Sequence, residues 1–165
     1  MIVAGALHHV NVLEIIRHPW FISAFMAGGC AQMFKFVRGW MLTGRPCWRE
    51  FFTTGGMPSG HSALVSSLAF AVGFTDGFDA PYAMIAVGLG LIVLVDAVTL
   101  RREAGEHARL IKRLAEQASS LDETTRRDID CLQERLGHSS GEMVSGVVFG
   151  GLISFVVCYI WDFWK

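Results

Sequence analysis

Four long apolar segments constrain the fold of this chain more than any other feature of its sequence. They cover residues 20–40, 59–74, 81–100 and 142–164. A helix needs about 20 mainly apolar residues to cross the hydrocarbon core of a bilayer. The chain is also 52% hydrophobic, with a mean hydropathy of +0.42. We therefore expect an all-α polytopic membrane bundle, with about four transmembrane helices, that forms one domain over residues 1–165.

The segment 101–137 differs in kind, because it is rich in charge and has few large apolar residues. Ala104, Ala108, Ile111 and Ala115 recur in it at helical spacing, with charged residues between them. This pattern predicts a helical hairpin outside the membrane, inserted between the third and fourth spans.

The basic residues predict the orientation of the bundle. Of the 14 Lys and Arg residues, 12 lie in the first connection, taken as 35–50, or in the third, 101–137. With four spans, these two connections lie on the same side of the membrane, and the positive-inside rule places that side in the cytoplasm. We expect an integral protein of the inner (cytoplasmic) membrane.

The remaining composition excludes several classes of function. A net charge of −1 gives no indication of nucleic-acid binding. The four cysteines form no Cys-x-x-Cys pair, so neither a zinc site nor a disulfide framework is indicated. No cluster of carboxylates is present that would bind magnesium or calcium. We expect neither a metal nor another cofactor.

The most informative short stretch is Gly-Gly-Met-Pro-Ser-Gly-His-Ser at 55–62, which precedes the second apolar segment. Pro58 can occupy a first helical turn, or Ser59 can cap the helix. A helix start offers free N–H groups and the positive end of the helix dipole, which suit an anion. His61 lies in that first turn and can transfer a proton at neutral pH.

The expected topology gathers further polar residues at the same membrane face. They are Arg45, Arg101, Arg102 and His138. Arginines bind phosphate oxygens through a planar fork, and two histidines can divide phosphoryl transfer between a nucleophile and a proton donor. Asp96, the one charge in the third apolar run, is either a functional carboxylate or the partner of a nearby arginine.

Three blocks of sequence resemble the divergent membrane branch of the type 2 phosphatidic acid phosphatase superfamily, which is related to vanadium-dependent haloperoxidases. The blocks are the motif at 55–63, Asp96 with Arg-Arg-Glu-Ala-Gly at 101–105, and Leu-Gly-His-Ser-Ser-Gly-Glu-Met-Val-Ser-Gly at 136–146. The resemblance extends over about residues 32–150.

In the first part of this pattern, the resemblance implies a phosphate-binding role for Arg45, which stands in its Arg-Pro. Lys35 resembles the phosphate-binding lysine, but nine residues separate it from Arg45 where the family usually has six, and Arg38 has the usual spacing. Ser59 and Gly60 match phosphate-binding residues. His61 matches the general acid that protonates the leaving group.

In the last part, the resemblance implies that His138 is the nucleophile and that Glu142, in place of the usual aspartate, orients it. The matching arginine is Arg101 or Arg102, more than thirty residues upstream. His107 is the competing candidate, because it follows Arg101 at the family's local spacing. Four residues after His107 stands Ile111, which cannot orient an imidazole, whereas Glu142 stands four residues after His138.

The implied function is metal-independent hydrolysis of a lipid phosphomonoester or diphosphate through a phosphohistidine intermediate, at a site facing the cytoplasm. The partners are then the lipid phosphate substrate and membrane lipids, and a homodimer would help to bury polar faces. Phosphatidate, phosphatidylglycerophosphate and isoprenyl diphosphate all remain open as substrates. The alternative is a non-catalytic membrane protein whose basic face binds anionic lipid headgroups or a partner protein.

The distribution of basic residues leads to a labelling prediction. In a cysteine-free background, Ser119→Cys should react with an impermeant maleimide only from the cytoplasmic side, and Asp79→Cys only from the opposite side. The reverse pattern of labelling would contradict the orientation and place the histidines on the outer face.

Overall fold

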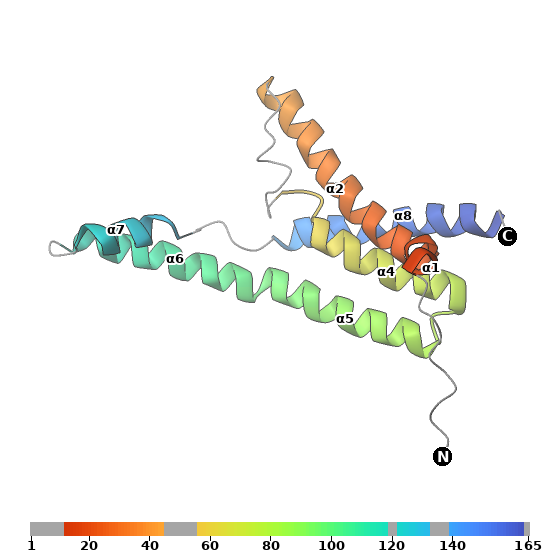
Figure 1. Cartoon of the computed structure of the whole chain (residues 1–165). Helices are drawn as coiled ribbons and strands as arrows, with labels where there is room; N and C mark the ends of the chain where they lie inside the picture. The colour runs from red at the N-terminus through yellow and green to blue at the C-terminus, as the bar shows by residue number, and fades with distance from the viewer. Residues whose placement is uncertain (1–11, 45–55, 119–121, 133–138, 164–165) are drawn as a thin grey trace, which may run out of the picture.

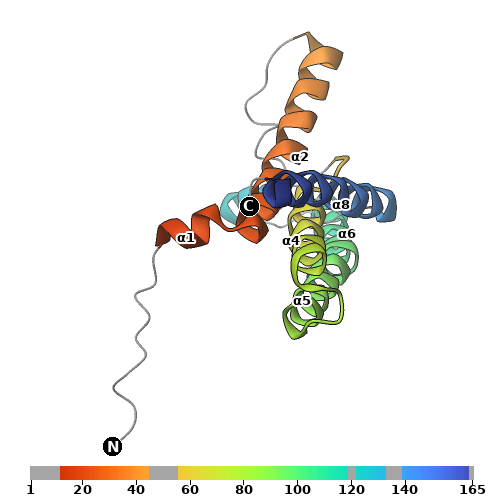
Figure 2. The same ribbon diagram turned by 90° about the vertical axis from the view of Figure 1, so that its right-hand side faces the viewer.

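The computed structural model describes residues 12–44, 56–118, 122–132 and 139–163, and within these ranges all regular structure is helical. Figures 1 and 2 show the arrangement of the helices. In chain order the helices are α1 (Val12–Arg17), α2 (Pro19–Thr43), α4 (Gly60–Asp76), α5 (Pro81–Val98), α6 (Leu100–Gln117), α7 (Glu123–Asp130) and α8 (Ser140–Phe163).

The predicted membrane bundle is confirmed. By length and composition, three candidate spans lie in the described residues: Pro19–Thr43, the apolar part of Pro81–Gln117, and Ser140–Phe163. The remaining predicted span, α4, has 17 residues and is about 26 Å long, close to the lower limit for crossing a bilayer.

Helix α4 is the centre of the bundle, because it packs against α2, α5 and α8. It runs parallel to α8 and antiparallel to α2 and α5. The hydroxyl of Ser154 donates to the backbone oxygen of Ser67 at 2.7 Å, which places α8 beside α4. The indole N–H of Trp20 donates to the hydroxyl of Thr75 at 2.7 Å, so the start of α2 lies beside the end of α4.

Small residues make the α4–α8 contact close. A Cβ added at Gly146 would lie 2.6 Å from the backbone oxygen of Ser59, and one at Gly150 would collide with Ala63 and Ser66. Gly146, Gly150 and Ser154 recur every four residues, so they lie along one face of α8. Such small residues allow helix backbones to approach within a membrane, where apolar burial provides little driving force.

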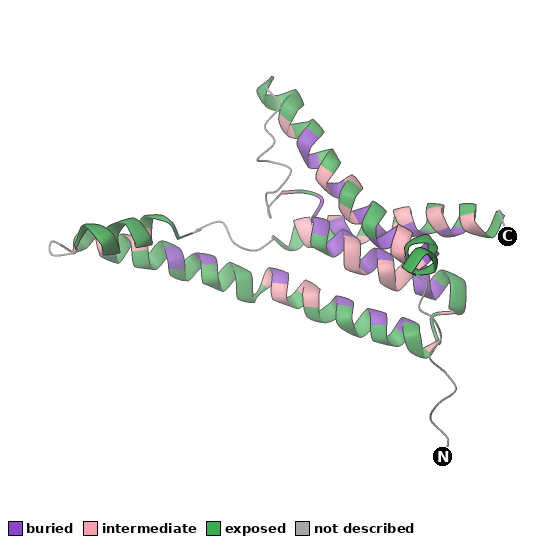
Figure 3. Ribbon diagram, in the orientation of Figure 1, coloured by how far each residue is buried: buried purple, intermediate pink, exposed green. Residues whose placement is uncertain are grey.

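The side chains are distributed as expected for a bundle surrounded by lipid. The buried residues are mostly small, such as Ala27, Ala31 and Ala63, which form one cluster. Large apolar side chains point outward, and Ile85 and Ile92 of α5 are 69% and 70% exposed. Figure 3 shows the buried residues concentrated where the helices meet and the outer faces exposed.

The predicted helical hairpin is present as α6 and α7, which pack against each other. Helix α6 continues the direction of α5 beyond Thr99 and, among the described helices, contacts only α5 and α7 (Figure 1). Asp122 caps α7, and hydrogen bonds from Thr124 and Thr125 lower the pKa of its carboxyl group to about 2. Because α6 contacts only α5 and α7 among the described helices, the hairpin projects away from α2, α4 and α8.

The close α4–α8 contact predicts that Gly150→Val destabilises the bundle. The added side chain must push α8 away from Ala63 and Ser66. Overpacking of this kind costs about 1–3 kcal/mol, which in a chain of this length corresponds to a drop in Tm of roughly 2–12 °C. Gly29→Val on α2 is the control, since a Cβ there meets nothing within 4 Å. Equal Tm values for the two variants in detergent would contradict the packing account.

Candidate functional site

Two helices begin side by side at one end of the bundle. Ser59 caps α4, and its hydroxyl accepts the N–H of Ser62 at 3.3 Å. The N–H of Ser59 donates to the backbone oxygen of Glu142, in the first turn of α8, at 3.2 Å. Because α4 and α8 are parallel, the positive ends of both helix dipoles meet here. Nearby negative charge stabilises such an arrangement.

The carboxylate of Glu142 supplies negative charge at this point. One oxygen, Oε2, accepts the N–H of Ser139 at 3.0 Å, while the hydroxyl of Ser139 accepts the N–H of Glu142 at 3.3 Å. These reciprocal bonds form a capping box at the start of α8. The other oxygen, Oε1, accepts the N–H of Gly56 at 3.2 Å. Glu142 thus ties the start of α8 to the segment that leads into α4.

Gly56 suits this position because its φ is +89°, a conformation that side chains other than glycine's rarely allow. A Cβ at Gly56 would lie 3.4 Å from Cδ of Lys35. Lys35 is only 8% exposed, although it belongs to a membrane-spanning helix. Its ammonium interacts electrostatically with the carboxylate of Glu142. We call Lys35, Gly56, Ser59, Ser139 and Glu142 the α4–α8 junction.

Helix α2 also supplies Gln32, one turn before Lys35. A Cβ at Gly60 would lie 3.1 Å from Nε2 of Gln32, so the amide lies against the start of α4. The Oε1 atom of Gln32 is buried and has no hydrogen-bond partner among the described residues. Gln32 was not among the predicted site residues. Its position one turn before Lys35 was the available signal.

The residues of the central motif take different positions. The hydroxyl of Ser59 is fully buried and also accepts a hydrogen bond from the hydroxyl of Ser62 at 3.0 Å. Gly60 and His61 are the first two residues of α4, where backbone N–H groups have no acceptor within the helix. The side chain of His61 is exposed. The motif therefore presents backbone amides and an imidazole, while its first serine acts as a cap.

Among the predicted phosphate-binding cations, Lys35 is at the junction. Arg38 is exposed and lies about one turn further along α2. Nε of Arg101 pairs with Oδ2 of Asp96 at 3.2 Å, so the expectation that Asp96 pairs with a nearby arginine is met. Nε of Arg102 pairs with Oε1 of Glu106 at 3.4 Å.

The hairpin helix α6 carries Arg101, Arg102 and His107, and His107 is exposed. Because α6 packs against neither α4 nor α8 in the described part of the chain, none of these residues reaches the junction through helix packing. Two central predictions, Arg45 and His138, lie outside the described residues, and α8 begins at Ser140. Within the described ranges, no three His, Cys, Asp or Glu side chains form a group that could bind a metal ion.

Comparison with known proteins identifies the class of this membrane bundle. The chain belongs to the Divergent PAP2 family, whose family model matches residues 16–153. This result confirms the resemblance on which the site residues were chosen.

One relative is similar over nearly its whole length. It is the Bacillus subtilis (strain 168) protein named "Uncharacterized membrane protein YuiD", which is 28% identical over 155 residues, covering 89% of this chain and 98% of the relative. No solved structure matches the chain.

The electrostatic interaction between Lys35 and Glu142 predicts energetic coupling. Glu142→Gln should lower stability because it leaves the buried ammonium without its counter-charge. Lys35→Met should relieve this loss, so that the double variant loses less stability than the sum of the two single variants, by at least about 1 kcal/mol. Denaturant unfolding in mixed micelles of the four proteins measures the coupling.

The matched control is the ion pair of Arg127 and Glu123 on α7, whose side chains are 75% and 78% exposed. Its coupling should be near zero, because solvent screens exposed charges. Purely additive effects at Lys35 and Glu142 would show that the two charges do not stabilise the junction.

Proposed function

We propose that this protein is a metal-independent membrane lipid phosphatase and that the α4–α8 junction is the core of its phosphate site. The observation that supports the proposal is the meeting of two helix N-termini beside the buried Lys35. Helix N-termini bind phosphate through free amides and the dipole, and a lysine adds a full positive charge. Membership of the Divergent PAP2 family supports the same class of chemistry.

In the proposed mechanism, the imidazole of His138 attacks phosphorus, and the bond between phosphorus and the oxygen of the lipid breaks. The imidazolium of His61 gives its proton to the departing oxygen. Water then attacks the phosphohistidine, His61 takes up a proton from that water, and the P–N bond breaks to release inorganic phosphate. Each proton and each bond is thereby accounted for, without a metal ion.

The other residues stabilise charge or hold the site in place. Lys35, Arg45 and the amides of Gly60 and His61 surround the equatorial oxygens, where phosphoryl transfer most needs positive charge. Glu142 is a positioning residue, since both of its oxygens hold backbone N–H groups of the two segments that carry the histidines. Arg101 and Arg102 lie outside this inner group.

A bilayer-embedded site favours a lipid substrate, because a soluble phosphate ester needs no access through the membrane. The phosphate is a monoester or a diphosphate. The site faces the cytoplasm in this proposal, in accordance with the distribution of basic residues.

Phosphate release from phosphatidate in mixed micelles tests the function. The purified protein should release phosphate in the presence of EDTA. His61→Ala and His138→Ala should each lower kcat by about 10²–10⁴. His107→Ala is the matched control and should keep most of the activity, because α6 does not pack against the junction.

Two outcomes would contradict this proposal, and a third would reassign its histidines. Loss of activity on chelation, restored by magnesium, would exclude the metal-independent mechanism. Saturable binding of phosphatidate without turnover would favour the alternative of a non-catalytic protein that binds anionic headgroups. An inactive His107→Ala beside a normal His138→Ala would exchange the roles of these two histidines.

A further inference from the structure

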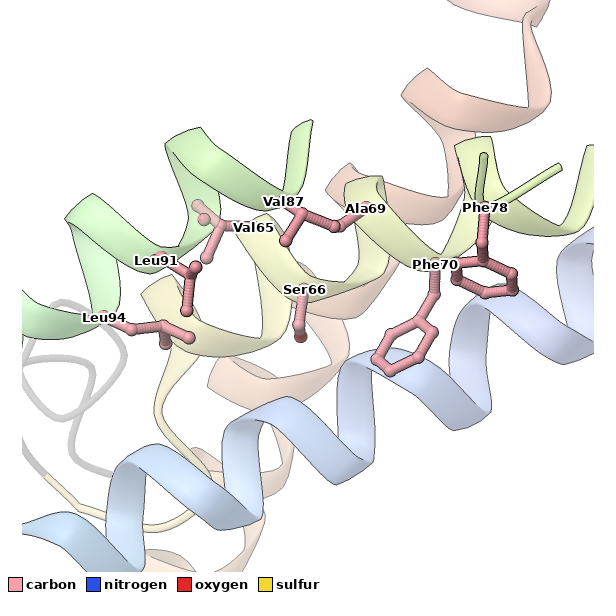
Figure 4. A pocket seen from close by; sticks show the side chains of 9 residues that line it. Val65, Ser66, Ala69, Phe70, Phe78, Val87, Leu91 and Leu94 are labelled. Carbon is pink, nitrogen blue, oxygen red and sulfur yellow. The ribbon is translucent and has the colours of Figure 1, made fainter. Parts of the chain in front are cut away.

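An apolar groove of about 140 Å³ lies between α4 and α5 (Figure 4). Its lining includes Val65, Ala69 and Phe70 from α4 and Leu91 and Leu94 from α5. The one hydroxyl in the lining belongs to Ser66 and donates to the backbone oxygen of Ser62 at 2.6 Å. The groove therefore offers a ligand apolar surface and no free polar group from its described walls.

The groove runs along α4 toward the first turn of that helix. A Cβ at Gly90 would lie 3.9 Å from the backbone oxygen of Val65, so these residues are opposite each other. Since α4 and α5 are antiparallel and rise 1.5 Å per residue, Leu94 lies about level with His61. The ion pair of Arg101 and Asp96 follows immediately on α5 and α6.

The other end of the groove is bounded by Phe70 and Phe78, whose rings meet edge to face with centroids 6.3 Å apart. From His61 to Phe70 the distance along α4 is about 13 Å. One end of this groove is therefore aromatic. The end near His61 has the backbone N–H groups of the first turn of α4.

We propose that the groove holds one hydrocarbon chain of the lipid phosphate substrate and thereby places its headgroup at the first turn of α4. This inference rests on the proposed function and assigns the groove to its substrate. A cavity of about 150 Å³ accommodates a benzene-sized ligand, so the groove encloses a section of about six carbons of the chain. The phosphate then lies at the first turn of α4, beside His61 and within the proposed phosphate site.

Photo-crosslinking tests the groove without requiring turnover. The probe is phosphatidic acid with a diazirine in the middle of one acyl chain, added to the full-length protein in nanodiscs of phosphatidylcholine. Mass spectrometry should find the cross-links concentrated on Val65, Ala69 and Leu91. A probe with the same chain and a neutral diacylglycerol head should label these residues several-fold less, because it lacks the negative charge that the start of α4 attracts.

Two glycines on α5 provide a matched pair of variants. The side chain added in Gly90→Leu fills the groove. The side chain added in Gly88→Leu points into open space, because a Cβ at Gly88 meets nothing within 4 Å. Labelling should fall roughly tenfold in Gly90→Leu, since about two methylene groups lose their burial, and should stay unchanged in Gly88→Leu. If Gly90→Leu does not fold, Val87→Trp replaces it. Val87 lines the same groove and is 41% exposed, so the larger side chain can fill the groove.

Equal labelling of the lipid-facing residues Ile85 and Ile92 in the wild type would overturn the proposal. So would labelling that neither groove variant reduces. Turnover separates the two proposals: Gly90→Leu should raise KM for a long-chain phosphatidate and leave KM for glycerol 3-phosphate, which has no acyl chain, unchanged. Labelling of the groove without any turnover would contradict the proposed phosphatase activity and support lipid binding in the groove. Turnover whose KM does not depend on the acyl chain would contradict only the assignment of the groove.

Discussion

The parallel contact between the N-terminal ends of α4 and α8 is the interaction on which the rest of the structure depends. Two positive dipole ends repel each other, and the carboxylate of Glu142 offsets this by binding the backbone N–H groups of Gly56 and Ser139. Gly146 and Gly150 bring the helix backbones close enough for those bonds to form. Because α2 and α5 then pack around α4, this one contact determines where Lys35, His61 and the groove lie.

The order and type of the helices could be predicted from the sequence, because long apolar runs and a charged insertion leave few alternatives. The pairing of helices could not be read in the same way. In a membrane helix, apolar residues cover all faces, so hydrophobic periodicity does not identify the partner. Gly146, Gly150 and Ser154 lie on one face of α8, but nothing in the sequence indicated that α4 packs against that face.

Individual residues of the candidate site could be predicted from the sequence, but the contacts that bring them together could not. The helix start at the Pro-Ser-Gly-His motif followed from local sequence. The resemblance left Lys35 and Arg38 as alternative phosphate-binding residues, and the structure buries Lys35 against Gly56 while Arg38 is exposed. The sequence Ser-x-x-Glu at 139–142 is typical of a capping box. The second hydrogen bond of Glu142, which it accepts from the N–H of Gly56, depends on tertiary structure. Membrane topology and the family resemblance both suggested that Arg102 joins the site, whereas α6 packs against neither α4 nor α8 among the described residues.

The central claim is that the α4–α8 junction binds a phosphate group, and the most direct test is binding of orthovanadate followed by ⁵¹V NMR. The full-length protein in detergent should broaden the vanadate signal saturably, and inorganic phosphate should reverse the effect. Lys35→Gln should weaken binding by roughly tenfold or more, because it removes the buried positive charge. Saturable binding that is unchanged in Lys35→Gln, or no binding by the wild-type protein, would contradict the account.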